Sequence, residues 1–209
     1  MKYIFVIGAP GSKSNLVANN IYFSPNVDRT DAHPLRESYI GPGSRGQILH
    51  QGAEFGPGME FGEFLGRMSQ HTREQCEAEF DRPFIGTGVR IIKCHVMAQH
   101  IDFIRATWPD CPVVLVHRAD DACMGWWVKS GQFDITYPNY SSYVNFEWMC
   151  QAISQQNAEI LSAWDQHPGR EVPNNLGLCI ATDLALPPDA YFQNYQQDDV
   201  RVKVLMAQN

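Results

Sequence analysis

The chain has 209 residues, of which 44% are hydrophobic and 19% are charged. This length and composition are typical of one folded domain of ordinary size and exclude a disordered or coiled-coil chain. With 16 basic and 23 acidic residues the formal net charge is −7. No overall positive field therefore exists to attract a nucleic-acid backbone, and any site for an anion must be local.

The cysteines and the first residues indicate the cellular environment. Six cysteines are scattered without a C-x-x-C pair, which is typical of free thiols in a reducing compartment. The opening MKYIFVIGAPGS reaches glycine too early for a signal peptide, and no stretch approaches the roughly 18 apolar residues of a membrane helix. The histidines and cysteines show no ligand spacing. We expect a cytoplasmic protein with no membrane insertion and no bound metal.

The predicted elements alternate between strands and helices. Residues 3–7 form a continuous apolar run, the pattern of a strand buried on both faces, and residues 14–22 predict a helix. Residues 24–66 are rich in Gly and Pro and predict a long loop insertion, with 41–62 either a lid over the site or a plain surface loop. A surface helix opened by a serine cap is predicted at 69–80. The later predictions are a strand at 89–93, a helix at 97–107, a strand at 112–117, helices at 119–129 and 144–165, and strands at 178–181 and 200–206.

Such alternation predicts the α/β class, as a three-layer parallel sheet flanked by helices, in a single domain over residues 1–209. Ligands of these sheets bind beyond the carboxyl ends of the strands. All three candidate ends are basic. The first strand leads into GAPGSKS at 8–14, the second ends in Lys93 and His95, and the third ends in His117 and Arg118.

These strand ends together predict an anion site. A multiply charged anion needs several donors from one direction, and small loop residues followed by a helix N-terminus let backbone N–H groups surround its oxygens. We therefore expect phosphate or sulfate. A Walker A loop would need glycine where Lys13 stands, and no strand ends in an Asp placed for Mg²⁺, which disfavours a nucleoside triphosphatase.

Three stretches resemble the P-loop sulfotransferases, which use 3′-phosphoadenosine 5′-phosphosulfate (PAPS) without a metal. GAPGSKS at 8–14 is similar to their 5′-phosphosulfate loop, IKCH at 92–95 to their I-K-T-H strand end, and VLVHR at 114–118 to the strand before their 3′-phosphate arginine. Segments 56–62 and 126–138 resemble more closely sulfotransferase-like proteins encoded by cyanobacterial phages. That likeness spans most of the chain and would place the protein in the host cytoplasm.

The resemblance implies a P-loop-type fold and transfer of a sulfuryl group from PAPS to a hydroxyl or amine of a small-molecule or carbohydrate acceptor. It implies that His95 acts as the general base and that Lys93 and Lys13 neutralise charge on the bridging oxygen. Arg118 would bind the 3′-phosphate. The residues expected to bind the cofactor are Gly8, Ala9, Pro10, Gly11, Ser12, Lys13, Ser14, Asn15 and Arg118.

The sequence departs from the family pattern in three places. Gly11 stands where the family usually has a basic residue, Trp126 stands where it has a serine, and a C-terminal R-K-G segment is absent from the sequence. Arg118 also has an alternative interpretation, as the ion-pair partner of Asp120 or Asp121 on the following helix.

Two other functions stay open at this point. In the first, Lys13 and Ser14 form a shortened Walker loop that binds ATP with Mg²⁺ in a kinase-like protein. In the second, the fold retains an anion pocket but serves as a catalytically inactive binding or assembly protein, and His95 is an ordinary strand-end histidine. The sequence identifies neither the acceptor nor the oligomeric state.

Overall fold

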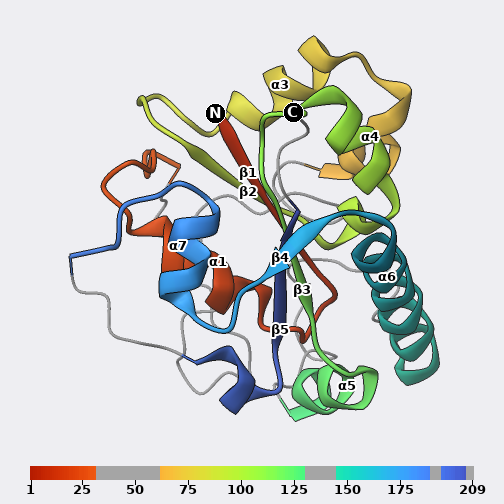
Figure 1. Ribbon diagram of the computed structural model, residues 1–209. Coiled ribbons are helices and arrows are strands. Elements are labelled where there is room, and N and C mark those ends of the chain that lie inside the picture. The colour runs from red at the N-terminus through yellow and green to blue at the C-terminus, as the bar shows by residue number, and fades with distance from the viewer. Residues whose placement is uncertain (32–61, 130–144, 189–193, 206–209) are drawn as a thin grey trace.

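The computed structural model describes residues 1–31, 62–129, 145–188 and 194–205 (Figure 1). Within these ranges the protein is an α/β structure whose sheet is flanked by helices. The strands are β1 (Tyr3–Gly8), β2 (Arg90–Lys93), β3 (Val113–His117), β4 (Gly169–Glu171) and β5 (Arg201–Leu205). The α-helices are α1 (Ser14–Tyr22), α3 (Arg73–Asp81), α4 (Ile101–Thr107), α5 (Asp120–Lys129), α6 (Phe146–Gln166) and α7 (Asn175–Ala181). The 3-10 helices are η1 (Gly62–Gln70), η2 (His95–His100) and η5 (Tyr195–Asp198).

The sheet is mixed, with the strand order β2-β1-β3-β5-β4. β1 pairs in parallel with β2 and β3, whereas β5 pairs antiparallel with both β3 and β4. The expectation of a wholly parallel sheet is therefore wrong for β5. Its alternating sequence, Arg-Val-Lys-Val-Leu, predicts a strand. The direction of that strand depends on the path of the preceding chain, which hydrophobic periodicity does not encode.

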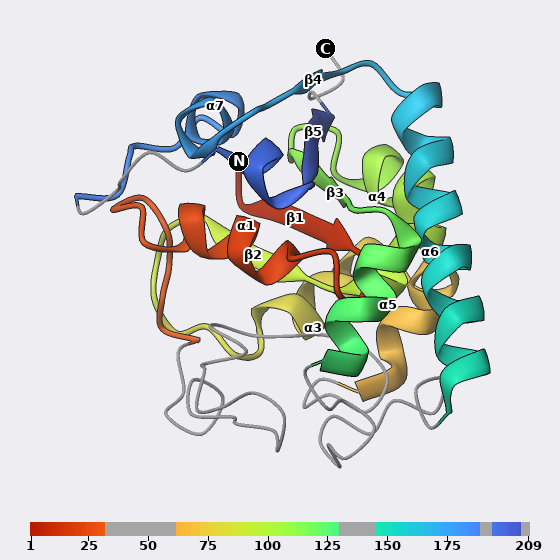
Figure 2. The same ribbon diagram turned by 90° about the horizontal axis from the view of Figure 1, so that it is seen from below.

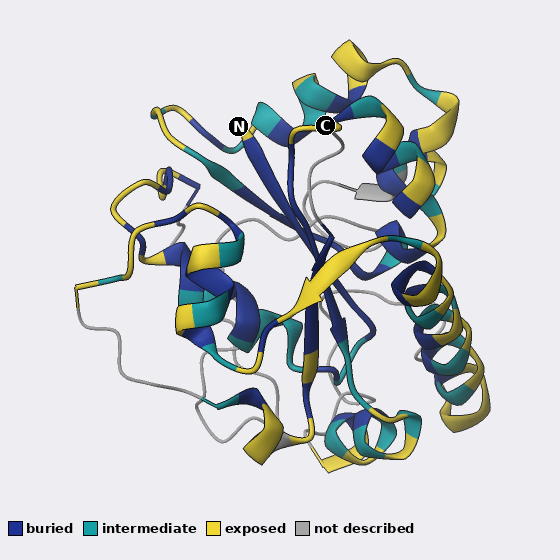
Figure 3. Ribbon diagram, viewed as in Figure 1, coloured by how far each residue is buried: buried dark blue, intermediate teal, exposed yellow. Residues whose placement is uncertain are grey.

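Two short elements differ from the sequence predictions. β4 consists of three exposed residues at the sheet edge (Figure 3), so it lacks the apolar pattern that predicts a strand. Residues 178–181 end helix α7 and are not a strand. Asn174 caps this helix by accepting a hydrogen bond from the Gly177 N–H at 2.9 Å. The helix buries Leu178 and Cys179, and a four-residue apolar run is too short to reveal that helical period.

Several boundaries also differ. The helix predicted at 97–107 is two elements, because the 3-10 helix η2 already begins at His95 and α4 follows it. The cap of α3 is Thr72 and not a serine: its Oγ1 accepts from the Gln75 N–H, and the Gln75 side chain accepts from the Thr72 N–H, which is a capping box. The candidate lid and most of the Gly/Pro-rich insertion lie outside the described residues.

Apolar cores cover both faces of the sheet. On one face Tyr3, Phe5 and Ile7 of β1 pack in a cluster with residues of α3, α4 and α6. On the other face Ile4 and Val6 pack with residues of α1 and α7, and Figure 1 shows these two groups of helices on opposite sides of the sheet. Every residue of β1 is buried (Figure 3). Burial on both faces explains the continuous apolar run of β1.

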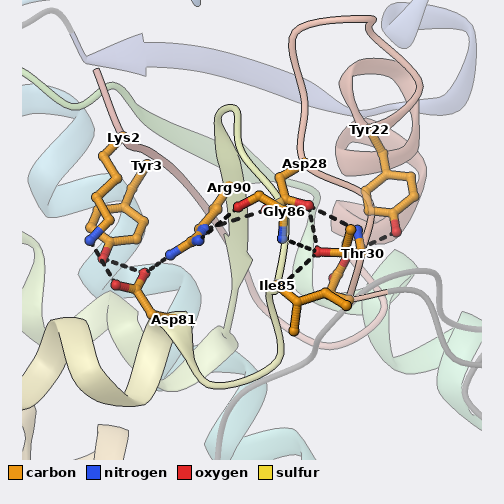
Figure 4. Close-up of polar contacts among 10 residues, drawn as sticks. Lys2, Tyr3, Tyr22, Asp28, Thr30, Asp81, Ile85, Gly86 and Arg90 are labelled. Carbon is orange, nitrogen blue, oxygen red and sulfur yellow. Dashed lines mark hydrogen bonds and ion pairs between the residues drawn. The ribbon is translucent and has the colours of Figure 1, made fainter.

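A network of charged side chains joins the amino ends of β1 and β2 (Figure 4). Asp81, the last residue of α3, accepts hydrogen bonds from Lys2 Nζ and Tyr3 Oη, each at 2.7 Å. It also accepts from the Arg90 guanidinium, whose Nε lies 3.6 Å from Asp28 Oδ2. Burial raises the pKa of Asp81, but the three donors outweigh it and hold the pKa below its ordinary value. The network therefore fastens α3 to the sheet through an ionised carboxylate.

Candidate anion-binding site

The carboxyl ends of three parallel strands meet at one edge of the sheet. β1 lies between β2 and β3, with Val6 beside Lys93 and Gly8 beside Val116. The chain runs from β1 to β2 on one side, then to β3 on the other side, and continues outward to β4 and β5. The connections therefore diverge between β1 and β3. Such a switch point is where α/β sheets bind ligands.

The loop after β1 has an unusual backbone. Gly11 and Lys13 have φ angles of +85° and +66°, and Ser12 between them is not among the residues with positive φ. An alternation of this kind turns successive N–H groups toward one side, which creates a concavity suited to an anion. Lys13 adopts a left-handed conformation that is unfavourable for a residue with a Cβ. A hydrogen bond from the Ser12 N–H to the Ala9 carbonyl, at 2.9 Å, closes the turn.

Neither glycine of this loop has room for a side chain. A Cβ on Gly8 would lie 2.5 Å from Ser12 Oγ, and a Cβ on Gly11 would lie 2.4 Å from the carbonyl oxygen of Cys123. Cys123 belongs to the first turn of α5, and Figure 2 shows that the loop runs beside this helix. The close approach and the positive φ together require glycine at position 11.

The Ser12 hydroxyl and the N-terminus of α1 are both oriented to interact with an anion. Ser12 is fully buried, and its Oγ has no hydrogen-bond partner among the described residues. Lys13, the N-cap residue of α1, makes no side-chain capping hydrogen bond. A buried hydroxyl without a partner costs about 1–3 kcal/mol, and a helix N-terminus carries a partial positive charge. An anion on the loop would give the hydroxyl an acceptor and the helix end a negative charge.

Lys93 connects the carboxyl end of β2 to the first turn of α1. Its side chain is buried, and its Nζ donates to Asn15 Oδ1 at 3.3 Å. Side chains alternate along a strand, so Lys93 lies on the same face as Ile91, which belongs to the cluster that includes α1. His95 follows two residues later, as the buried first residue of η2. The end of β2 thus places the Lys93 side chain beside the N-terminus of α1, which follows the loop.

Arg118 contacts the loop directly. Its Nη1 donates to the carbonyl oxygens of Gly11 and Ala122, each at 3.2 Å. Among the described ion pairs, none joins Arg118 to Asp120 or Asp121. The guanidinium therefore links the loop after β1 to the loop and helix after β3.

His117 is the other basic residue at the end of β3. It lies beside Arg201 of β5 in the sheet register. Burial lowers the pKa of His117 below its ordinary value of 6.5, and the charge of Arg201 lowers it further. His117 is therefore mainly neutral at pH 7, so Arg118 is the cation that this strand end supplies.

Within residues 1–31, 62–129, 145–188 and 194–205, no group of three or more His, Cys, Asp or Glu side chains is arranged to hold a metal ion. No helix in the same ranges combines the length and the apolar character that crossing a membrane requires.

Sequence reasoning missed the polar residues of α6 that support this edge of the sheet. Asn157 is buried on the same helix face as Ile153 and Ile160. The sequence did contain a signal for Asn157, because it is a polar residue on the apolar face of a predicted helix and such a residue needs hydrogen-bond partners. Its contacts reach the main chain of Arg118, as described below.

A comparison with known protein families finds no match, and neither the curated proteins nor the solved structures include one. The resemblance to the sulfotransferases therefore stays a prediction from the motifs. Function has to be argued from the residues that the fold brings together.

Proposed function

We propose that the protein is a sulfotransferase-like enzyme with a P-loop-type fold, which moves a sulfuryl group from PAPS to a hydroxyl or amine of a small-molecule or carbohydrate acceptor. One observation carries this proposal. The loop at 8–14 lies at the carboxyl ends of parallel strands, where Arg118 contacts its Gly11 and Lys93 contacts Asn15 directly after it. The loop also contains the buried Ser12 hydroxyl, for which the described residues offer no hydrogen-bond partner.

The residues of the site fit the phosphosulfate end of the cofactor. The positive-φ backbone of the loop and the Ser12 hydroxyl would hold its oxygens, and the N-terminus of α1 would stabilise its negative charge. Lys13 and Lys93 would add positive charge. When bound, the cofactor supplies an activated sulfuryl group with a phosphate as the leaving group.

The chain's own contribution would be positioning, electrostatic stabilisation and removal of one proton. Lys13 and Lys93 would stabilise the negative charge that develops as the phosphate leaves. His95 would accept the proton of the acceptor hydroxyl, a role typically worth about 10²–10⁴ in rate. Its position at the start of η2, two residues after Lys93 at the end of β2, supports this assignment.

A specific observation favours a second candidate, an anion-binding protein without transferase activity. The Arg118 guanidinium donates to the backbone carbonyls of Gly11 and Ala122, so its observed contacts hold the loop. In this alternative Arg118 shapes the pocket, and the site binds a phosphate or sulfate group without transferring it.

Thermal unfolding with 3′-phosphoadenosine 5′-phosphate (PAP), and separately with ATP, each with and without Mg²⁺, tests the site. A ligand at a hundred times its Kd adds about 2.7 kcal/mol, or roughly 5–10 °C in Tm for a chain of this size. We expect this rise with PAP, independent of Mg²⁺. Lys93→Gln should remove it, and Arg82→Gln, which deletes an exposed charge at the other end of the sheet, should not. Stabilisation only by ATP with Mg²⁺ would support the kinase-like alternative instead.

The two buried serines Ser12 and Ser24 offer a matched pair. Both are fully buried, but Ser24 Oγ contacts Asn26 Oδ1 at 3.4 Å, whereas Ser12 Oγ has no partner in the described residues. Ser12→Ala should weaken PAP binding about tenfold while leaving the free energy of unfolding unchanged or slightly higher. Ser24→Ala should lower stability by up to about 1 kcal/mol and leave the affinity unchanged. Equal effects of the two variants on PAP affinity would remove Ser12 from the site.

Catalysis is tested by the release of PAP from PAPS in the presence of a panel of sugars, phenols and amines. We expect turnover in the wild type and its loss in His95→Gln, with PAP binding retained. Undiminished turnover in His95→Gln would refute the general-base assignment. PAP binding without turnover in the wild type would favour the anion-binding alternative.

A further inference from the structure

A partly buried polar cluster joins α6 to the first turn of α5. Ser154 Oγ donates to Asp120 Oδ2, and Asn157 Nδ2 donates to Asp120 Oδ1, each at 2.6 Å. Asn157 is 2% exposed. Every other buried residue of α6 is apolar. Burying a polar group costs free energy unless it is hydrogen-bonded, so the hydrogen bonds of Asn157 indicate what this residue does.

Asn157 also holds the main chain at the end of β3. The same Nδ2 donates to the carbonyl oxygen of Arg118 at 3.0 Å, and the Cys123 thiol contacts that carbonyl at 3.4 Å. Both partners of Nδ2 are acceptors, which fixes the orientation of the amide. Asn157 therefore fastens the backbone of Arg118 and the side chain of Asp120, the first residue of α5, to one point of α6.

The side chain of Arg118 continues this connection to the loop. Its Nη1 bonds the carbonyls of Gly11 and Ala122, and Gly11 packs against the backbone of Cys123 so closely that a Cβ has no room. A continuous series of contacts thus runs from Asn157, through Arg118, to the turn that contains Ser12. Moving the Arg118 backbone would move the group that holds this turn.

We propose that Asn157 is a positioning residue for the anion site. By fixing Asp120 and the Arg118 carbonyl, it holds the Arg118 guanidinium on Gly11 and so maintains the shape of the loop that receives the anion. The inference rests on the proposed function in that its first readout is PAP binding. It also assigns a positioning role to Arg118 through the contacts that the side chain makes in the protein.

A double-mutant cycle on PAP affinity tests whether Asn157 acts through Arg118. We expect Asn157→Ala to raise the Kd for PAP about tenfold in the wild-type background and less than twofold in the Arg118→Ala background, because coupled residues are non-additive. Gln155→Ala, which removes an exposed amide of the same helix, should change the Kd less than twofold in either background. If Asn157→Ala raises the Kd for PAP by the same factor in both backgrounds, the proposal is overturned.

A second readout separates this inference from the proposed function. Amide hydrogen exchange at residues 11–14 should accelerate about tenfold in Asn157→Ala and not in Gln155→Ala, whether or not PAP binds. Ser154→Ala, which removes one donor to Asp120 and leaves Asn157 in place, should give a smaller effect in the same direction and serves if Asn157→Ala does not fold. If the wild type fails to bind PAP but the loop exchanges as expected, the proposed function fails and the positioning role stands. Exchange at 11–14 that matches the control variant would overturn the positioning role.

Discussion

The two ends of the central strands use polar side chains in opposite ways. At the amino ends of β1 and β2, Asp81 receives donors from three residues. Asp28 Oδ2, which has no hydrogen-bond partner in the part of the chain that the structure describes, lies 3.6 Å from Arg90 Nε. At the carboxyl ends, the buried Ser12 hydroxyl has no partner within the described residues, and Lys13 adopts an unfavourable φ.

This difference distinguishes stabilisation from binding. A network whose donors are paired with carboxylates, as the three donors to Asp81 are, contributes to folding and leaves few donors to bind an anion. A site with a buried donor and a strained loop lowers stability until a ligand completes it, which is typical of functional sites. The following predictions test whether stability and binding separate between the two ends.

The largest expected effect is on stability at the amino end. Asp81→Ala removes the acceptor of Tyr3 Oη and of Arg90 Nη1, which should lower the free energy of unfolding by about 2–4 kcal/mol. Affinity for PAP should not change. Urea denaturation measures the change in the free energy of unfolding, provided that the m-value stays the same. Asp165→Ala, which deletes an exposed carboxylate of α6, is the control. A loss of PAP affinity in Asp81→Ala would show that the two ends are coupled.

A smaller loss of stability, with a large loss of binding, is expected for Gly11→Ala. The new Cβ would meet the Cys123 carbonyl at 2.4 Å, in a backbone with φ of +85°, so we expect a loss of about 1–3 kcal/mol and PAP binding weakened more than tenfold. Gly125→Ala places the same methyl group in open space on α5 and should raise stability by about 0.5–1 kcal/mol. Unchanged PAP affinity in Gly11→Ala would contradict the proposed position of the site.

The smallest effect is a pH dependence that differs between the two ends. Burial lowers the pKa of His117 and of His100 below 6.5, so the unfolded chain binds protons first as the pH falls, and stability should decrease below about pH 6.5. The lowered pKa of Asp81, ordinarily 3.8, means that the amino-end network loses its contribution only below about pH 4. Urea unfolding between pH 3 and pH 8 measures both ranges. His117→Gln should reduce the loss of stability in the upper range, with His100 accounting for the remainder, and should leave the lower range unchanged; an unchanged upper range would refute the assignment to His117.

Much of the sheet could be predicted because a buried strand has a recognisable apolar sequence. The apolar run of β1 and the β-branched run of β3 reflect cover on both faces, and the carboxyl-end rule then indicated which residues would meet. β4 could not be predicted in this way, because all its residues are exposed and they form no apolar pattern. The antiparallel direction of β5 could not be predicted either, since it depends on how the chain between β4 and β5 crosses the sheet.

The sequence indicated the residues of the candidate site but not their contacts. The glycine loop, Lys93 and Arg118 are visible as basic strand ends. Nothing local indicates that Arg118 holds the Gly11 carbonyl or that Asn157 holds Arg118. These contacts join segments that are distant in sequence, and only the packing of α6 against α5 brings them together.

The position of β5 has a consequence for how the molecule folds. β5 inserts between β3 and β4, and its pairing joins Val113 to Leu205 and Gly169 to the same residue. Such long-range pairs slow folding, because the entropy of closing a large loop is lost before the contacts form. Until β5 arrives, the apolar strand β3 presents an open edge that another chain can pair with. Newly made chains should therefore aggregate most readily in this interval, and the exposed, charged edge strand β4 closes the sheet only when β5 is in place.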